Sequence, residues 1–173
     1  MVIATFLTTA LPVFIFNDGT PAAAASQIAP CQGGNLWGAY IDTGAATGNF
    51  VYNIALVNVG HISCRLNGYP GIQGMRGGRI YDLHVARHGT FAGNLAPTVL
   101  SPRMSGELIL SVADNCNALN TGGISKIKKI AAANTYSNLT VKLPGAAGDV
   151  YLFGFKVDIA CGLDVSRLGW KAN

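Results

Sequence analysis

The chain has 173 residues, of which 50% are hydrophobic and only 12% are charged, with a formal net charge of +4. This composition excludes a disordered protein, because so apolar a chain offsets the entropy cost of folding by burial, and the length predicts one domain. It also argues against nucleic-acid binding, which needs a denser stripe of basic residues interleaved with aromatic ones. The 22 glycines are scattered between short apolar runs, a pattern typical of many turns between short strands.

The first segment in chain order is apolar, with no charged side chain in residues 2–16. A polar break and an alanine run at residues 22–25 follow it, which predicts a signal peptide over residues 1–25 and cleavage before Ser26. No Lys or Arg precedes Arg65, so the true start lying upstream, or a misassigned start codon, stays open. A membrane anchor is the alternative, but the run is shorter than the ~20 apolar residues of a span. We therefore expect no stable membrane insertion after cleavage.

Residues 26–173 are predicted to form a single β-sandwich domain. Strand signals are strong where β-branched and aromatic residues lie between turn residues, at 50–58, 79–87 and 150–160. Weaker signals lie at 36–41, 107–112 and 139–143. Several short strands with glycine, proline and asparagine breaks indicate an all-β sandwich.

Alternation within two of these strands predicts which side chains share a face. In strand 79–87 the shared face carries Tyr81, Leu83 and Val85, with Asp82 and His84 opposite. In strand 150–160 the shared face carries Tyr151, Phe153, Phe155 and Val157. Residues 124–130 are ambiguous, because isoleucines at every third position suit a helical turn but also permit an edge strand guarded by lysines. We favour the edge strand.

Four cysteines, an even number in an exported chain, predict disulfides, and the absence of a C-x-x-C motif gives no support for a zinc site. Four cysteines permit three pairings. If strands 36–41 and 50–58 are antiparallel neighbours, Cys31 and Cys64 flank adjacent ends. Cys116 and Cys161 likewise follow strands 107–112 and 150–160. We therefore predict Cys31–Cys64 and Cys116–Cys161.

The most distinctive stretch, residues 58–71, reads Asn-Val-Gly-His-Ile-Ser-Cys-Arg-Leu-Asn-Gly-Tyr-Pro-Gly. It resembles the actinobacterial domain-of-unknown-function family 4232, whose members typically read N-x-G-x-x-x-C-x-L-x-G-Y-P-G after a hydrophobic strand. The cysteine positions and a proline-marked turn before residue 107 also fit. One departure is Arg103-Met104-Ser105, where the family more often has a glycine after the proline. The resemblance implies an exported, immunoglobulin-like antiparallel β-sandwich with two disulfides, and it brings no established activity and no catalytic residues.

The local chemistry of this motif favours a structural role over a ligand-binding loop. Gly68 adopts a positive φ at little cost, while Pro70 fixes its own φ and biases Tyr69 towards an extended conformation. We expect Leu66 and Tyr69 to pack where the chain turns a corner.

A weak candidate metal site comprises Asp82, His84 and His88, whose even numbers place them on one strand face, and a carboxylate with imidazoles suits zinc or copper. The alternative is an exposed strand face. Trp37, Tyr40, Tyr136 and Trp170 suggest a stacking platform, but the odd separation of Trp37 and Tyr40 directs them to opposite faces. We expect no cofactor, and no nucleophile, base and orienting group can be assembled from motifs.

Two glycine-containing stretches, 71–78 and 89–97, are predicted to be recognition loops, because loops on a rigid scaffold commonly carry binding. Their side chains best able to anchor a partner are Arg76, Phe91 and Leu95. The predicted function is a secreted or cell-wall-associated, non-catalytic interaction module with an unknown envelope or extracellular partner. The alternative is a secreted small-ligand or metal-binding protein, and the third possibility is a minor hydrolase.

Overall fold

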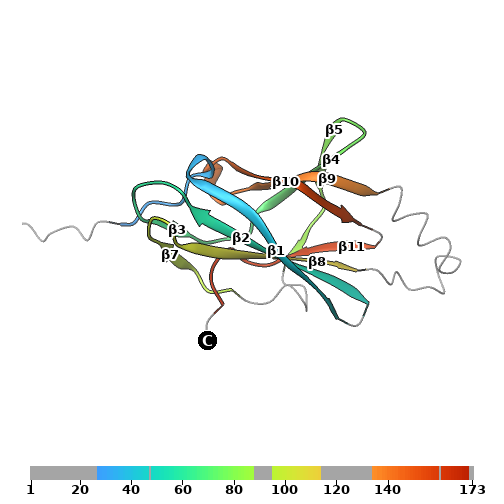
Figure 1. The fold of residues 1–173 in the computed structure, drawn as a ribbon, viewed down its shortest axis with the longest axis horizontal. Helices are drawn as coiled ribbons and strands as arrows, with labels where there is room; N and C mark the ends of the chain where they lie inside the picture. The colour runs from blue at the N-terminus through green and yellow to red at the C-terminus, as the bar shows by residue number, and fades with distance from the viewer. Residues whose placement is uncertain (1–26, 47, 88–94, 114–133, 160, 172–173) are drawn as a thin grey trace, which may run out of the picture.

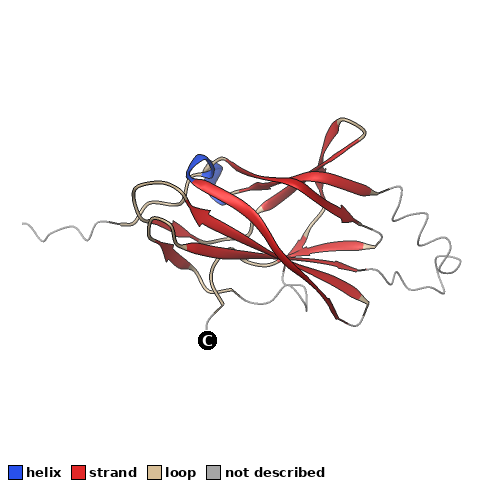
Figure 2. Ribbon diagram, in the orientation of Figure 1, coloured by secondary structure: helices blue, strands red, loops and turns tan. Residues whose placement is uncertain are grey.

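The computed structural model describes residues 27–46, 48–87, 95–113, 134–159 and 161–171. Strands arranged in two layers dominate these residues, and the helical content is two short 3₁₀ turns, η1 (Gly33–Asn35) and η2 (Pro144–Ala146) (Figures 1 and 2). One layer is a five-stranded sheet, ordered β1 (Leu36–Ala46), β2 (Asn49–Asn58), β8 (Ser105–Ala113), β11 (Gly162–Val165) and β6 (Ala86–Arg87). The other is a four-stranded sheet, ordered β10 (Asp149–Asp158), β9 (Thr135–Lys142), β4 (Gly71–Arg76) and β5 (Arg79–Leu83). A two-stranded ribbon of β3 (Cys64–Leu66) and β7 (Thr98–Leu100) lies at one end.

The core lies between the layers and is built by alternate residues of the facing strands. Ile54 and Leu56 of β2 pack in one cluster with Leu139 and Val141 of β9, all fully buried. The all-β prediction is confirmed, and among the strands of the described residues each pairing is antiparallel except that of β11 with β6. The immunoglobulin-like topology stays a prediction.

The predicted single strand 79–87 is wrong, because the chain changes sheets within it. β5 pairs with β4 in the four-stranded sheet, whereas β6 pairs with β11 in the five-stranded sheet. The two residues between them, His84 and Val85, carry the chain across the edge of the sandwich. The predicted alternation of side chains continues where the chain passes from one sheet to the other, since Leu83 and Val85 both pack against the core.

The predicted recognition loop 71–78 is also wrong, because most of it is β4, which lies between β9 and β5. Only Gly77 and Gly78 turn, with φ of 56° and 76°, which fits a two-residue hairpin of the type that twists with its strands. Gly74 was predicted to be part of a flexible loop, but it is required by the close packing of β4 against β9. A Cβ at Gly74 would lie 2.8 Å from the Cβ of Tyr136.

A bulge in β10 overturns the predicted single face of strand 150–160. Register with β9 shifts between Leu152 and Lys156, and Gly154 within the bulge has a φ of 72°. Before the bulge the even-numbered side chains are buried, and after it the odd-numbered Phe155 and Val157 are buried. Tyr151 and Phe153 therefore face solvent.

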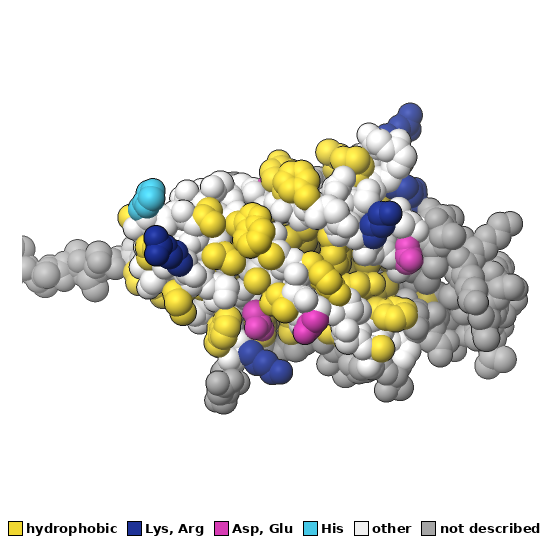
Figure 3. All heavy atoms as spheres, viewed as in Figure 1, with side chains coloured by type: hydrophobic (Ala, Val, Ile, Leu, Met, Phe, Trp, Pro, Cys, Tyr) yellow, Lys and Arg dark blue, Asp and Glu magenta, His cyan; other side chains and the backbone are white. Residues whose placement is uncertain are grey.

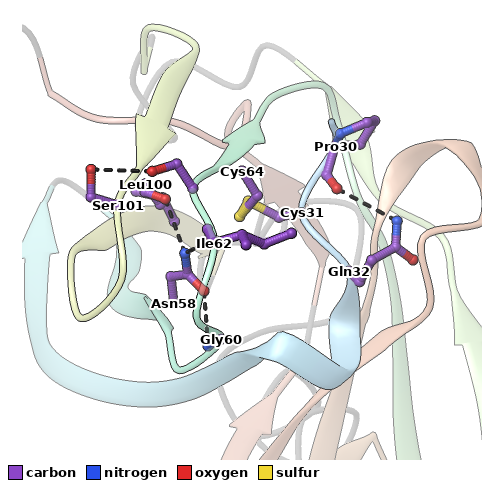
Figure 4. The surroundings of a disulfide bond; sticks show 10 residues. Pro30, Cys31, Gln32, Asn58, Gly60, Ile62, Cys64, Leu100 and Ser101 are labelled. Carbon is purple, nitrogen blue, oxygen red and sulfur yellow. Dashed lines mark hydrogen bonds between the residues drawn. A yellow bond between two sulfur atoms is a disulfide. The ribbon is translucent and has the colours of Figure 1, made fainter. Parts of the chain in front are cut away.

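The corner that carries the family-like motif is organised by Asn58, which is 1% exposed (Figure 4). Its Nδ2 donates to the carbonyls of Ile62 and Leu100 at 2.9 Å each, and its Oδ1 accepts from the N–H of Gly60 at 3.0 Å. This buried network closes the turn into β3. The structural interpretation of the motif also fits a φ of 91° at Gly68 and full burial of Leu66.

The Cys31–Cys64 disulfide is confirmed (Figure 4), with a Cα–Cα distance of 4.7 Å. It leaves Cys116 and Cys161 as the remaining pair of the four. Cys116 lies outside the described residues, so the second bridge stays a prediction. The signal peptide 1–25, the ambiguous segment 124–130, His88 and Phe91 also lie outside them. Within the described part of the chain, no helix has the length and apolarity to cross a membrane.

Candidate binding groove

The outer face of the four-stranded sheet carries two rows of side chains that run across the strands. The first row follows the register Tyr151, Thr140, Gln73 and Asp82 from β10 to β5. In the second row, Phe153 of β10 lies beside Asn138 of β9, followed by the paired Met75 and Ile80. Large apolar groups thus stand on the two sides of the sheet, with short polar groups on β9 between them.

These rows form a shallow groove of about 210 Å³. Tyr151 and Phe153 form one wall, Met75 and Ile80 form the other, and Asn138, Thr140 and Gly74 form the floor. The groove exists because β9 presents small polar side chains where its neighbours present large apolar ones. Gly74 lines the floor with its backbone, since a Cβ there would point toward Tyr136 and the buried Leu139 and not into the groove.

The two aromatic side chains are the most exposed part of the groove. Tyr151 is 55% exposed and Phe153 is 82% exposed. Their rings are nearly parallel, with centroids 5.9 Å apart and an interplanar angle of 25°. This offset stack holds the rings in place, so they present a preformed apolar wall to solvent.

No charged side chain lines the groove. Asp82, which lies beside it in the first row, accepts a hydrogen bond from Gln73 Nε2 at 2.8 Å. Asn138 Oδ1 accepts from the N–H of Gly154 at 3.0 Å, which fixes the side chain and leaves its Nδ2 to donate elsewhere. The groove therefore suits a ligand that is neutral, partly apolar and able to accept hydrogen bonds.

The residues predicted to anchor a partner do not gather at this groove. Leu95, expected to be available to a partner, is instead buried at 4% exposure. Arg76 is half-buried and held by its neighbours, since its Nη1 donates to Asn134 Oδ1 at 2.7 Å. Its guanidinium also lies over the rings of Tyr81 and Tyr136, at 4.8 and 5.1 Å from their centroids. Phe91 lies outside the described residues.

Two of the three candidate metal residues, Asp82 and His84, line one hollow. Asp82 lies on β5, while His84 follows that strand in the crossing to the other sheet, and His88 lies outside the described residues. Among the described residues, no three His, Cys, Asp or Glu side chains gather into a group able to hold a metal. The first two residues therefore offer at most part of a site.

The aromatic residues first considered as a platform lie elsewhere. Trp37 is 60% exposed on the outer side of β1. Tyr40 and Tyr52 pack instead against the ring of Phe155, at 5.5 and 5.2 Å between centroids. Burial raises the pKa of Tyr52, and the charge of Asp158 and then that of Tyr40 raise it further, so Tyr52 remains neutral at ordinary pH. The ring of Phe155 thus links the two sheets here, while Tyr40 itself is 48% exposed.

The groove was missed because the predicted strand 150–160 placed Tyr151 and Phe153 on the same face as Phe155, which is buried. The sequence does place Tyr151 and Phe153 on one side of their strand, two residues apart. Gly154 is the signal of the bulge that separates them from the buried Phe155, because glycine inside a strand often marks a bulge. No model of a known protein family matches this chain, and no curated protein matches it either.

Proposed function

We propose that this chain is an exported, non-catalytic binding module that takes a neutral glycan of the cell envelope in the groove between β10 and β4. The observation that carries the proposal is the exposed, stacked pair of Tyr151 and Phe153 above a floor of short polar side chains. A pyranose ring has an apolar face of C–H groups and a rim of hydroxyls. Aromatic rings can stack on the apolar face of the sugar. The amide of Asn138 and the hydroxyl of Thr140 can form hydrogen bonds with its hydroxyls.

The size of the groove favours a polymer over an enclosed small molecule. Small-ligand pockets typically reach about 300–1,000 Å³ and bury most of the ligand, whereas this groove has about 210 Å³ and is shallow. A polymer gains affinity from repeated contacts along the sheet face without being enclosed. The groove lining also carries no carboxylate, histidine or cysteine, which supports binding without chemistry.

Export is part of the proposal. The apolar segment that ends in an alanine run and the Cys31–Cys64 disulfide both support it, because disulfides persist in oxidising compartments. The motif at residues 58–71 supports membership of the domain-of-unknown-function family 4232 as a further proposal. Protein recovered from the culture medium or envelope should begin near Ser26 when its N terminus is sequenced.

The proposal is tested by affinity gel electrophoresis of the exported protein in soluble neutral glucan, mannan and galactan. We expect at least one of these polymers to retard the protein. Tyr151→Ala and Phe153→Ala should each weaken that binding by about tenfold, the effect of losing an anchor worth about 1.4 kcal/mol. Stability should change little, because both side chains are exposed.

Trp37→Ala provides the matched control, since Trp37 is an aromatic residue of similar exposure on the other sheet. It should leave glycan binding unchanged. The proposal is wrong if none of the three polymers retards the wild-type protein. It is also wrong if Trp37→Ala weakens binding as much as Phe153→Ala does.

A further inference from the structure

Two loops form a surface at one end of the sandwich, the left end in Figure 1. Residues 59–63 connect β2 to β3, and residues 101–104 connect β7 to β8. Asn58 ties the loops together, because its backbone N–H donates to the carbonyl of Met104 at 2.9 Å while its side chain holds Ile62. We call these two loops the loop end, and the buried network beneath them makes it a defined surface.

Large apolar side chains of the loop end point into solvent. Val59 is 56% exposed, Ile62 is 69% exposed and Met104 is 58% exposed. Single exposed hydrophobic residues are normal, but several on adjoining loops indicate an interaction surface. Val99 of β7, beside the loop end, is a further exposed aliphatic side chain at 45%.

The two charged side chains within residues 58–66 and 98–106, Arg65 and Arg103, are both basic. Arg65, Arg103 and His61 are exposed there, and neither residues 58–66 nor residues 98–106 contain an acid. Figure 3 shows this arrangement on the face it presents, where a histidine, a basic side chain and hydrophobic side chains occupy the left end and the acidic side chains lie away from it. The loop end therefore complements an anionic surface.

We propose that the loop end docks reversibly on an anionic lipid bilayer. Val59, Ile62 and Met104 enter the boundary between headgroups and acyl chains, while Arg65 and Arg103 interact with the lipid phosphates. This combination of an apolar part with flanking basic side chains is the one that binds peripheral proteins to membranes. Such docking differs from membrane insertion, since only side chains of two loops leave water.

A bilayer fits this surface better than a protein partner does. The apolar side chains project from loops. The hollow that lies nearby, lined by Cys31 and Arg65, has a volume of only about 20 Å³ and is too small to receive a side chain of a protein partner. Projecting aliphatic groups can enter a fluid layer without a complementary pocket. The described chain also enters the fold at this end, because Pro30 bridges to Arg65 of β3.

The docking site is separate from the groove. The groove is formed by β4, β5, β9 and β10, and the loop end shares no residue with it. A docked molecule therefore keeps its groove available, and the two proposals can fail independently.

Co-sedimentation of the exported protein with lipid vesicles tests the proposal. We expect binding to vesicles of phosphatidylcholine mixed with anionic phosphatidylglycerol, and much weaker binding to phosphatidylcholine alone. Ile62→Ser with Met104→Ser should lower the partition coefficient at least about tenfold, since each change removes an apolar group that would leave water. Arg65→Gln with Arg103→Gln should lower it by about tenfold and remove its dependence on salt.

Phe153→Ser is the matched control, because it removes an exposed apolar side chain from the groove. It should bind vesicles as the wild type does while binding glycan about tenfold more weakly, and the loop-end variants should bind vesicles more weakly while keeping glycan binding. Thermal unfolding checks that each variant folds. The proposal is overturned if the wild type ignores anionic vesicles, or if the folded apolar double variant still binds them fully. Retention on lipid-free envelope material that depends on Ile62 and Met104 would also overturn it, in favour of a protein or polymer partner.

Discussion

At the scale of single residues, Arg103 occupies a backbone conformation that suits glycine. Its φ is 69°, and the N–H of Met104 donates to the carbonyl of Ser101 at 3.0 Å, which closes a four-residue turn with Pro102 in its second position. A proline in the second position of a turn followed by a positive φ in the third position indicates a type II turn, in which glycine is the preferred third residue. This is also where the chain departs from the family that it resembles.

Replacing Arg103 by glycine should therefore stabilise the protein. A side chain in the left-handed region costs about 1–2 kcal/mol, and the greater freedom of glycine in the unfolded chain offsets about 0.4–1 kcal/mol of the gain. We expect a net increase of about 0.5–1 kcal/mol in the free energy of unfolding, measured by urea denaturation. Arg103→Ala is the control, since it removes the same charge but keeps the Cβ. Equal stabilisation by both variants would show that charge, and not φ, is responsible.

At the scale of an element, the bulge in β10 decides which aromatic side chains face solvent. Gly154 has a φ of 72°, and a Cβ built on it would meet no atom within 4 Å. Glycine is therefore required at this position for its backbone conformation and not for lack of space around it. Asn138 of β9, itself at a φ of 49°, supports the bulge by accepting a hydrogen bond from Gly154.

Gly154→Ala should consequently lower the free energy of unfolding by about 1 kcal/mol, the cost of a side chain in the left-handed region. Gly44→Ala provides the comparison, because Gly44 also has open space around it but no positive φ. In a strand, alanine there should be neutral or slightly stabilising. If the two variants unfold at the same urea concentration, the bulge does not depend on the backbone conformation of Gly154.

At the scale of the whole molecule, the Cys31–Cys64 disulfide joins the start of the fold to the β3–β7 ribbon. The two residues are 33 positions apart in sequence, so the bridge closes a long loop in the unfolded chain. Both cysteines are buried, at 3% and 7% exposure. The bridge thus tethers the loop end and the N-terminal entry of the chain to the core.

Replacing both cysteines by alanine should lower the free energy of unfolding by about 3–4 kcal/mol, because the unfolded chain regains the entropy of the open loop. Equilibrium unfolding with and without a reducing agent measures the effect. The double variant should lose less stability than the wild type when reductant is added, since it no longer has this bridge to lose. A double variant as stable as the oxidised wild type would show that packing alone holds this end.

The amino-acid sequence determined the features that depend on neighbours along the chain. Alternating apolar residues and turn residues predicted the all-β class and most long strands. The Cys31–Cys64 bridge was predicted because these cysteines flank adjacent ends of strands 36–41 and 50–58. Only the tertiary structure decided which face of a strand is buried, because that depends on the opposing sheet. Two glycines show why. Gly74 reads as a loop residue but packs against Tyr136 in a central strand. Gly154 reverses the faces of β10, so that Tyr151 and Phe153, expected to share a face with Phe155, form the wall of the groove on the opposite face.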